Sequence, residues 1–88
     1  MVLSQEKRQQ LYWPYVEIMK DCRTNVSLSQ AKLAKDADLS PKYVTLIEGG
    51  RRCPSLESLL ALMASSGVER ATAEALVKEV LDNFEWEG

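Results

Sequence analysis

The sequence contains no histidine and only two cysteines among its 88 residues. Histidine is the commonest general base and a frequent zinc ligand, so its absence excludes a Ser-His-Asp arrangement and any His-bearing zinc site. Cys22 and Cys53 form no CxxC pair and cannot supply a four-ligand metal site within one chain. We interpret both as small apolar residues; a disulfide stays open, although a reducing compartment argues against one. We expect no metal and no cofactor.

Long apolar runs are also absent. The longest stretches without charge, such as residues 58–68, are far short of the ~20 apolar residues that cross a membrane. The chain turns polar at its fourth residue, so we expect no secretory signal, no membrane association and a cytoplasmic location. An apolar fraction of 45% with 27% charged residues is typical of a soluble globular protein, and 88 residues suit one domain.

Charge is distributed unevenly along the chain. The net charge is −2, but residues 1–68 carry nine basic against seven acidic residues, whereas residues 69–88 carry two against six. A local basic face matters more to an anionic partner than the total charge does. The acidic end also fits an ordinary solvated helix, so charge alone leaves the partner open.

Prolines and glycines divide the chain into short segments in which apolar residues recur at helical spacing. This pattern predicts an all-α protein with five helices. Proline suits the first turn of a helix and serine its N-cap, so these residues locate several of the helix starts. The predicted helices cover residues 14–23, 30–37, 41–48, 56–67 and 72–84, with a helical arm at residues 4–10 that Pro14 interrupts. Their expected apolar faces are Tyr15, Ile18, Met19 and Cys22; Leu33, Ala34 and Ala37; Val44 and Ile47; Leu56, Leu59, Leu60 and Met63; and Ala73, Leu76, Val77, Val80, Leu81 and Phe84.

Only residues 38–40 separate the second and third predicted helices. Two short helices joined so tightly cross at a steep angle, as in a helix-turn-helix. The second helix of such a unit can enter the major groove of DNA, which is about as wide as a helix. The spacing also fits any small helical bundle with a tight corner, so on spacing alone both alternatives stay open.

The residues themselves carry a more specific pattern. The ordered set is Leu28-Ser29-Gln30, Leu33-Ala34, Leu39-Ser40, Tyr43-Val44, Ile47-Glu48, Gly50, Arg52, Pro54-Ser55-Leu56 and Leu59. Each element is weak alone, but together they resemble the Cro/repressor-type (XRE) helix-turn-helix family over about residues 15–68. The resemblance implies a five-helix lambda-repressor-like domain that binds double-stranded DNA.

The family's roles transfer to matching positions. Gln30 resembles the residue that contacts the phosphate backbone and braces the recognition helix, which would be residues 41–48. Arg23 and Glu48 match the family's structural ion pair. The resemblance places base contacts on the exposed side of the recognition helix and phosphate contacts in the loop after it. The expected DNA-binding residues are Gln30, Ser40, Pro41, Lys42, Tyr43, Thr45, Leu46, Arg51 and Arg52.

Several of these positions allow two interpretations. Lys42 can donate to guanine, or it can simply be solvated. Leu46 can meet a thymine methyl or pack inward. Because neither Pro41 nor Leu46 has a side-chain donor, we expect sequence preference to depend partly on DNA shape. Lys32 and Lys35 are further phosphate candidates, with a solvated helix face as the alternative.

Two positions depart from the family pattern. Asp38 occupies the turn position that is usually glycine, and aspartate can adopt the left-handed conformation at modest cost. Gly49 stands where the family often has a charged residue, which removes one potential backbone contact. We expect neither departure to break the fold.

The chain divides into an N-terminal arm (1–13), the helix-turn-helix domain (14–68) and a C-terminal helix (69–88). A small DNA-reading protein makes few base contacts alone, so we expect a homodimer on paired half-sites. The terminal aromatics Tyr12, Trp13, Phe84 and Trp86 either meet a partner or fold back onto the core. The expected dimer interface is Leu76, Val77, Val80, Leu81 and Phe84.

The resulting hypothesis is a dimeric transcriptional regulator that reads an inverted-repeat operator and needs no small-molecule ligand. Its layout resembles restriction–modification controller proteins and small phage or plasmid repressors. The alternatives are the antitoxin of a toxin–antitoxin pair and a protein-interaction module that has lost DNA binding. An enzyme is not expected, because the helix-turn-helix pattern occupies most of the chain and leaves no acid–base constellation.

Overall fold

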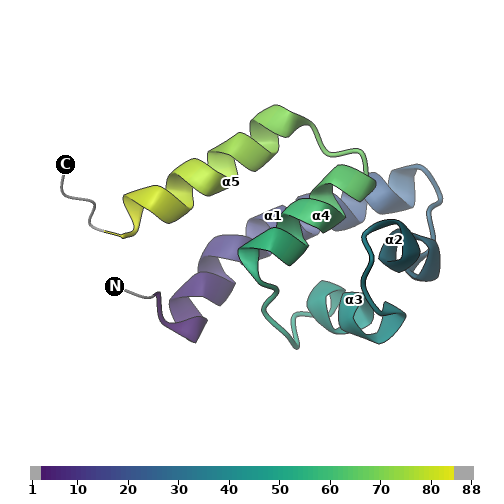
Figure 1. Ribbon diagram of the computed structural model, residues 1–88, viewed down its shortest axis with the longest axis horizontal. Helices are drawn as coiled ribbons and strands as arrows, with labels where there is room; N and C mark the ends of the chain where they lie inside the picture. Colours follow the sequence, from purple (N-terminus) through teal and green to yellow (C-terminus); the bar gives the residue numbers. More distant parts are fainter. Residues whose placement is uncertain (1–2, 85–88) are drawn as a thin grey trace.

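Within residues 3–84, which the computed structural model describes, the chain forms five α-helices and no strand (Figure 1). The prediction of an all-α, five-helix fold is confirmed. None of the helices in this part of the chain is long and apolar enough to cross a membrane. The helices are α1 (Gln5–Asn25), α2 (Gln30–Asp36), α3 (Pro41–Glu48), α4 (Leu56–Ser65) and α5 (Arg70–Asp82).

Serine side chains set where four of the five helices begin. Each hydroxyl accepts a hydrogen bond from a backbone N–H in the first turn, which that turn cannot satisfy internally. The capping serines are Ser4, Ser29, Ser40 and Ser55, for α1 to α4 in order. Helix α5 follows Glu69 without a side-chain cap and begins two residues before the start predicted at Thr72.

Helix α1 continues through Pro14, so the prediction that the first helix starts there was wrong. A proline in a helix interior removes one hydrogen bond and costs ~3 kcal/mol or more. Residues on both sides of Pro14, including Tyr12 and Val16, are buried in the core, while Pro14 itself is exposed. We infer that this burial offsets the cost, because a continuous helix keeps the residues before and after Pro14 in the core.

The core lies where α1 and α4 pack against each other and against α2, α3 and α5. It consists of Tyr12, Tyr15, Val16, Met19, Leu33, Ala34, Val44, Ile47, Leu59, Leu62, Met63, Leu76 and Val80. Ile18 was wrongly assigned to it and is 39% exposed. Leu62 is fully buried, although it was not among the predicted core residues of α4. Helix α4 packs against helices on more than one side, so more than one of its faces is apolar and buried.

Figure 1 shows α5 along one side of α1 and α4, with α2 and α3 on the other side. Helix α1 contacts α5. Burial and the nearby Glu79 carboxylate of α5 raise the pKa of the Tyr15 hydroxyl of α1. Helices α2 and α3 contact each other and the α1/α4 layer. The α2–α3 unit is therefore held on a scaffold, with α3 away from α5.

The turn between α2 and α3 is built on a left-handed residue, as expected. Asp38 has φ +58°, and the N–H of Leu39 donates to the Ala34 carbonyl at 2.8 Å. The end of α1 uses the same conformation at Ser27, with φ +56°. Serine has no special tolerance for this region, whereas glycine adopts it without steric cost.

We expect Ser27→Gly to raise the free energy of unfolding by about 1 kcal/mol, because it relieves the left-handed strain. Asp38→Gly should give a smaller gain, since aspartate already tolerates this conformation. Urea denaturation at unchanged m-value would measure both. A destabilised Ser27→Gly protein would contradict the assignment of strain to this residue.

Candidate nucleic-acid interface

A buried ion pair ties α1 to the end of α3. Arg23 Nε donates to Glu48 Oε2 and Arg23 Nη2 donates to Glu48 Oε1, both at 2.7 Å. Arg23 Nη1 also donates to the Leu28 carbonyl at 2.7 Å. The side chains are 12% and 2% exposed, respectively. Because the bond is bidentate and both groups are shielded from water, the pair fixes the position of α3 relative to α1.

Gln30 extends this network to the first turn of α2. Its Nε2 donates to Glu48 Oε1 at 3.0 Å, and its Oε1 accepts from Thr45 Oγ1 at 2.8 Å. These two bonds determine which way the amide faces. Gln30 thus braces α3 directly. This is one of the two roles that the family resemblance implied, the other being a phosphate contact.

The outer side of α3 is open to solvent. Pro41, Lys42 and Thr45 are exposed, whereas Tyr43 and Leu46 are half-buried. The Thr45 hydroxyl also lies 3.0 Å from the Pro41 carbonyl, so both acceptors near it are internal. Ser40 caps the helix by accepting from the Tyr43 N–H at 3.1 Å. On this face, Thr45 and Ser40 form hydrogen bonds within the protein, whereas the long side chain of Lys42 extends into solvent as a potential donor.

The loop after α3 presents two arginines. Arg51 and Arg52 are exposed, and the backbone N–H of Arg51 donates to the Leu46 carbonyl at 2.9 Å. The Arg52 guanidinium lies 5.3 Å from the centroid of the Tyr43 ring, a cation–π distance. Stacking on a half-buried ring limits the orientations that Arg52 samples next to α3.

Trp13 supports the same loop, a role that sequence reasoning missed. Gly50 has φ +73°, and a Cβ at this position would lie 3.4 Å from Trp13 Cζ3. The indole therefore packs directly under the turn that carries Arg51. The only sequence signal was the glycine beside the arginines, which did not indicate the distant tryptophan.

The lysines of α2 differ in their surroundings. Lys32 Nζ forms an ion pair with Asp36 at 2.8 Å, which favours the solvated-face interpretation for this lysine. Lys35 is exposed on the same helix.

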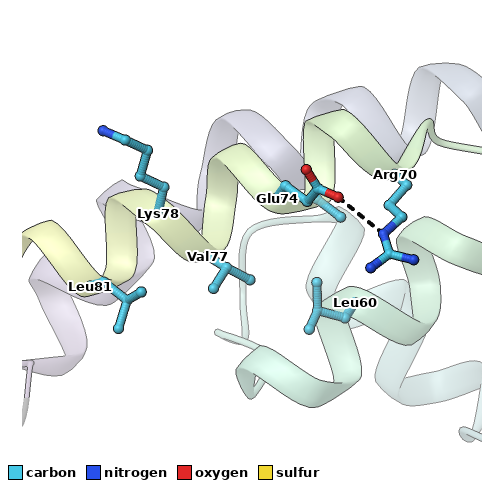
Figure 2. Close-up of a pocket in the computed structure, with 7 residues that line it drawn as sticks. Leu60, Arg70, Glu74, Val77, Lys78 and Leu81 are labelled. Atoms are coloured by element: carbon cyan, nitrogen blue, oxygen red, sulfur yellow. Dashed lines mark hydrogen bonds and ion pairs between the residues drawn. The ribbon is translucent and has the colours of Figure 1, made fainter.

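The predicted dimer residues do not share one surface. Leu76 is 0% exposed and Val80 is also buried, so the structure corrects the assignment of these two to an interface. Val77 and Phe84 are half-buried, and Leu81 is 47% exposed. Figure 2 shows that Val77 and Leu81 lie on the side of α5 where Leu60 of α4 is found. Trp86 lies outside the described residues.

Both cysteines are free and half-buried. Phe84 contacts the core together with Tyr12 and Trp13 from α1, so these three aromatics fold back at least in part.

A sequence model of the helix-turn-helix family matches residues 19–71, from the middle of α1 to the start of α5. This match covers more than half of the chain, and the protein belongs to that family. It is a helix-turn-helix DNA-binding transcription regulator with the lambda-repressor-like fold. The family is one of regulators that bind double-stranded DNA. No curated protein and no solved structure gives a significant match to the chain.

Proposed function

We propose that this protein is a sequence-specific regulator that binds an inverted-repeat operator as a homodimer. The observation that carries the proposal is the network of Arg23, Glu48, Gln30 and Thr45, which fixes α3 while leaving its outer side exposed. A recognition helix held in this way is already ordered, so little conformational entropy is lost when it enters the major groove.

Phosphate binding is assigned to side chains at the two ends of the helix-turn-helix. An amide nitrogen carries two hydrogens, and Glu48 accepts only one from Gln30, so the other can donate to a phosphate oxygen. Arg51 and Arg52 can each bind a phosphate with two parallel hydrogen bonds. Such contacts position the protein on the duplex without reading its sequence.

Base reading is assigned mainly to Lys42. A lysine at this position can donate to guanine O6 or N7. The Thr45 hydroxyl is occupied internally, so its methyl group is the part that can meet a thymine methyl. Pro41 and half-buried Leu46 add apolar contact only, so DNA shape supplies part of the preference.

Dimerisation is assigned to half-buried Val77 and exposed Leu81 of α5, together with half-buried Phe84. A twofold dimer would present two α3 helices to half-sites about one helical turn apart. Within this class, the resemblance noted above favours a restriction–modification controller or a small phage or plasmid repressor.

The proposal is tested by titrating duplex DNA with the protein at several salt concentrations and measuring retardation in a gel. The logarithm of the affinity should fall linearly with the logarithm of salt concentration, with a slope near −0.9 per phosphate contacted. DNA binding that is absent even at low salt, by a folded protein, would overturn the proposal. That result would favour a protein partner, either a toxin or another interaction target.

A further inference from the structure

A cavity of about 320 Å³ opens at the end of the molecule where α1 begins and α5 ends (Figure 1). Three segments line it: the N-terminal part of α1, the start of α4 and the C-terminal end of α5 with the residue that follows it. This volume lies at the lower end of the range, roughly 300–1,000 Å³, in which proteins hold small ligands.

Most of the cavity wall is apolar. Its apolar side chains are Leu3, Leu56, Val80 and Phe84. Ser55 also lines it, but its hydroxyl caps α4 by accepting from the Ser58 N–H at 3.1 Å and donates to Ser58 Oγ at 2.9 Å. Arg8 and Tyr12 are therefore the lining side chains with polar groups left for a ligand, and no acidic side chain of the described residues lines the cavity.

Arg8 differs from the other basic residues of the chain. Between residues 3 and 84, only Arg8 and Arg23 are half-buried, and the other lysines and arginines are exposed. Arg23 has Glu48 as its counter-charge, whereas no acidic side chain in this range forms an ion pair with Arg8. The Arg8 Nε is buried and has no hydrogen-bond partner among the described residues. A guanidinium held partly out of water without a counter-charge is unfavourable, so this position favours an anion beside it.

Tyr12 adds a second donor to the same wall. It is 3% exposed and lies one helical turn after Arg8, so both side chains are on the same face of α1. Burial raises the pKa of the Tyr12 hydroxyl, and the nearby Arg8 charge lowers it by less. The hydroxyl therefore stays protonated at neutral pH and can donate a hydrogen bond.

We propose that this cavity binds a small monocarboxylic acid with an apolar body, such as a medium-chain fatty acid, whose carboxylate pairs with Arg8 and accepts a hydrogen bond from Tyr12. A guanidinium can donate two parallel hydrogen bonds to a carboxylate, and the hydrocarbon chain covers the apolar wall. The proposal does not depend on DNA binding. Such a ligand was not expected from the sequence, because a cavity between three helices leaves no local signal in it.

The charge of the site selects a carboxylate over a phosphate. One guanidinium balances one negative charge, whereas a phosphate monoester carries close to two at neutral pH. The second charge would lie against the apolar wall without compensation, which is costly. A neutral alcohol of the same chain length would leave the guanidinium as unpaired as it is without a ligand.

The test titrates the full-length, isotope-labelled protein with octanoate and, separately, with 1-octanol, and follows the backbone amide resonances by NMR. Octanoate should cause saturable shifts at Arg8, Tyr12 and Leu56, and 1-octanol should bind at least about tenfold more weakly because it lacks the charge. Equal affinities would overturn the proposal. Shifts confined to Val77 and Leu81 would mean adventitious apolar binding elsewhere, and the absence of any saturable shift at millimolar octanoate would also overturn it.

Arg8→Met and Lys7→Met are matched variants for the same titration. Both remove one positive charge from neighbouring positions of α1, but Lys7 is exposed and does not line the cavity. Arg8→Met should weaken octanoate at least about tenfold and leave 1-octanol unchanged, while Lys7→Met should change neither. Equal weakening by the two variants would reduce the effect to net charge and overturn the assignment. Circular dichroism checks that both variants are folded, and the comparison of octanoate with 1-octanol on the original protein stands without them.

Discussion

Arg23→Met is expected to lower the free energy of unfolding by about 3–5 kcal/mol, because it leaves the Glu48 carboxylate buried without its counter-charge. Glu48 is 2% exposed and takes two hydrogen bonds from Arg23, so water cannot replace the lost partner. At about 4–8 °C per kcal/mol for a domain of this size, the melting temperature should fall by at least ~12 °C. Thermal and urea unfolding monitored by circular dichroism would measure the loss.

The matched control replaces both partners at once. Arg23→Met with Glu48→Leu removes the charge and its counter-charge together, and the double variant should be more stable than Arg23→Met alone. Gln30 Nε2 then loses its acceptor, which keeps the double variant below the original protein. Strict additivity of the two single effects would contradict the account of a coupled buried pair.

Replacing both Arg51 and Arg52 by alanine is expected to weaken binding to every duplex by roughly a hundredfold for each protomer at moderate salt, because each protomer loses two charge-assisted phosphate contacts. The salt slope should become shallower by about 1.8 for each protomer, and by about 3.6 for the proposed dimer. Both side chains are exposed, so stability should change little. Gel retardation on a preferred and an unrelated duplex would measure both effects.

Lys42→Ala is the contrasting variant, since it removes the proposed base contact rather than a proposed phosphate contact. It should change the ranking of DNA sites, with a cost of about 1–3 kcal/mol at the preferred sequence and much less elsewhere. If the arginine pair changed the ranking and Lys42→Ala weakened all sites alike, the assignment of the two surfaces would be reversed.

The helix-turn-helix itself was predictable because its signals are local. Ser29 and Ser40 mark helix starts by capping, and Pro41 suits a first helical position, so α3 was predicted with the bounds that the structure has. The left-handed conformation of Asp38 was expected from the family resemblance, because this turn position is usually glycine. The pairing of Arg23 with Glu48 joins positions far apart in the chain, and only the family resemblance indicated it.

The ends of the domain were predicted less well because long-range packing decides them. Pro14 is a breaker by local rules, but α1 passes through it since Tyr12 and Val16 are buried on either side. For α5, helical spacing identified the apolar residues but could not divide them between two surfaces. Leu76 and Val80 face the core while Leu81 faces outward, and that division depends on how α5 lies against α1 and α4.

The contacts that support the loop after α3 could not be predicted from local sequence signals either. Trp13 and Gly50 meet only because the first half of α1 passes beneath the end of α3. The stacking of Arg52 on Tyr43 likewise depends on how the loop folds back. In both cases the residue types were visible in the sequence, but the contact required the tertiary structure.

The central claim, a dimeric regulator with a defined operator, is tested most directly by selecting random duplex DNA with the purified protein at moderate salt and sequencing what it retains. We predict enrichment of an inverted repeat whose half-sites lie about one helical turn apart, as two α3 helices in a twofold dimer require. No enriched sequence, combined with no retention of DNA even at low salt, would contradict the account.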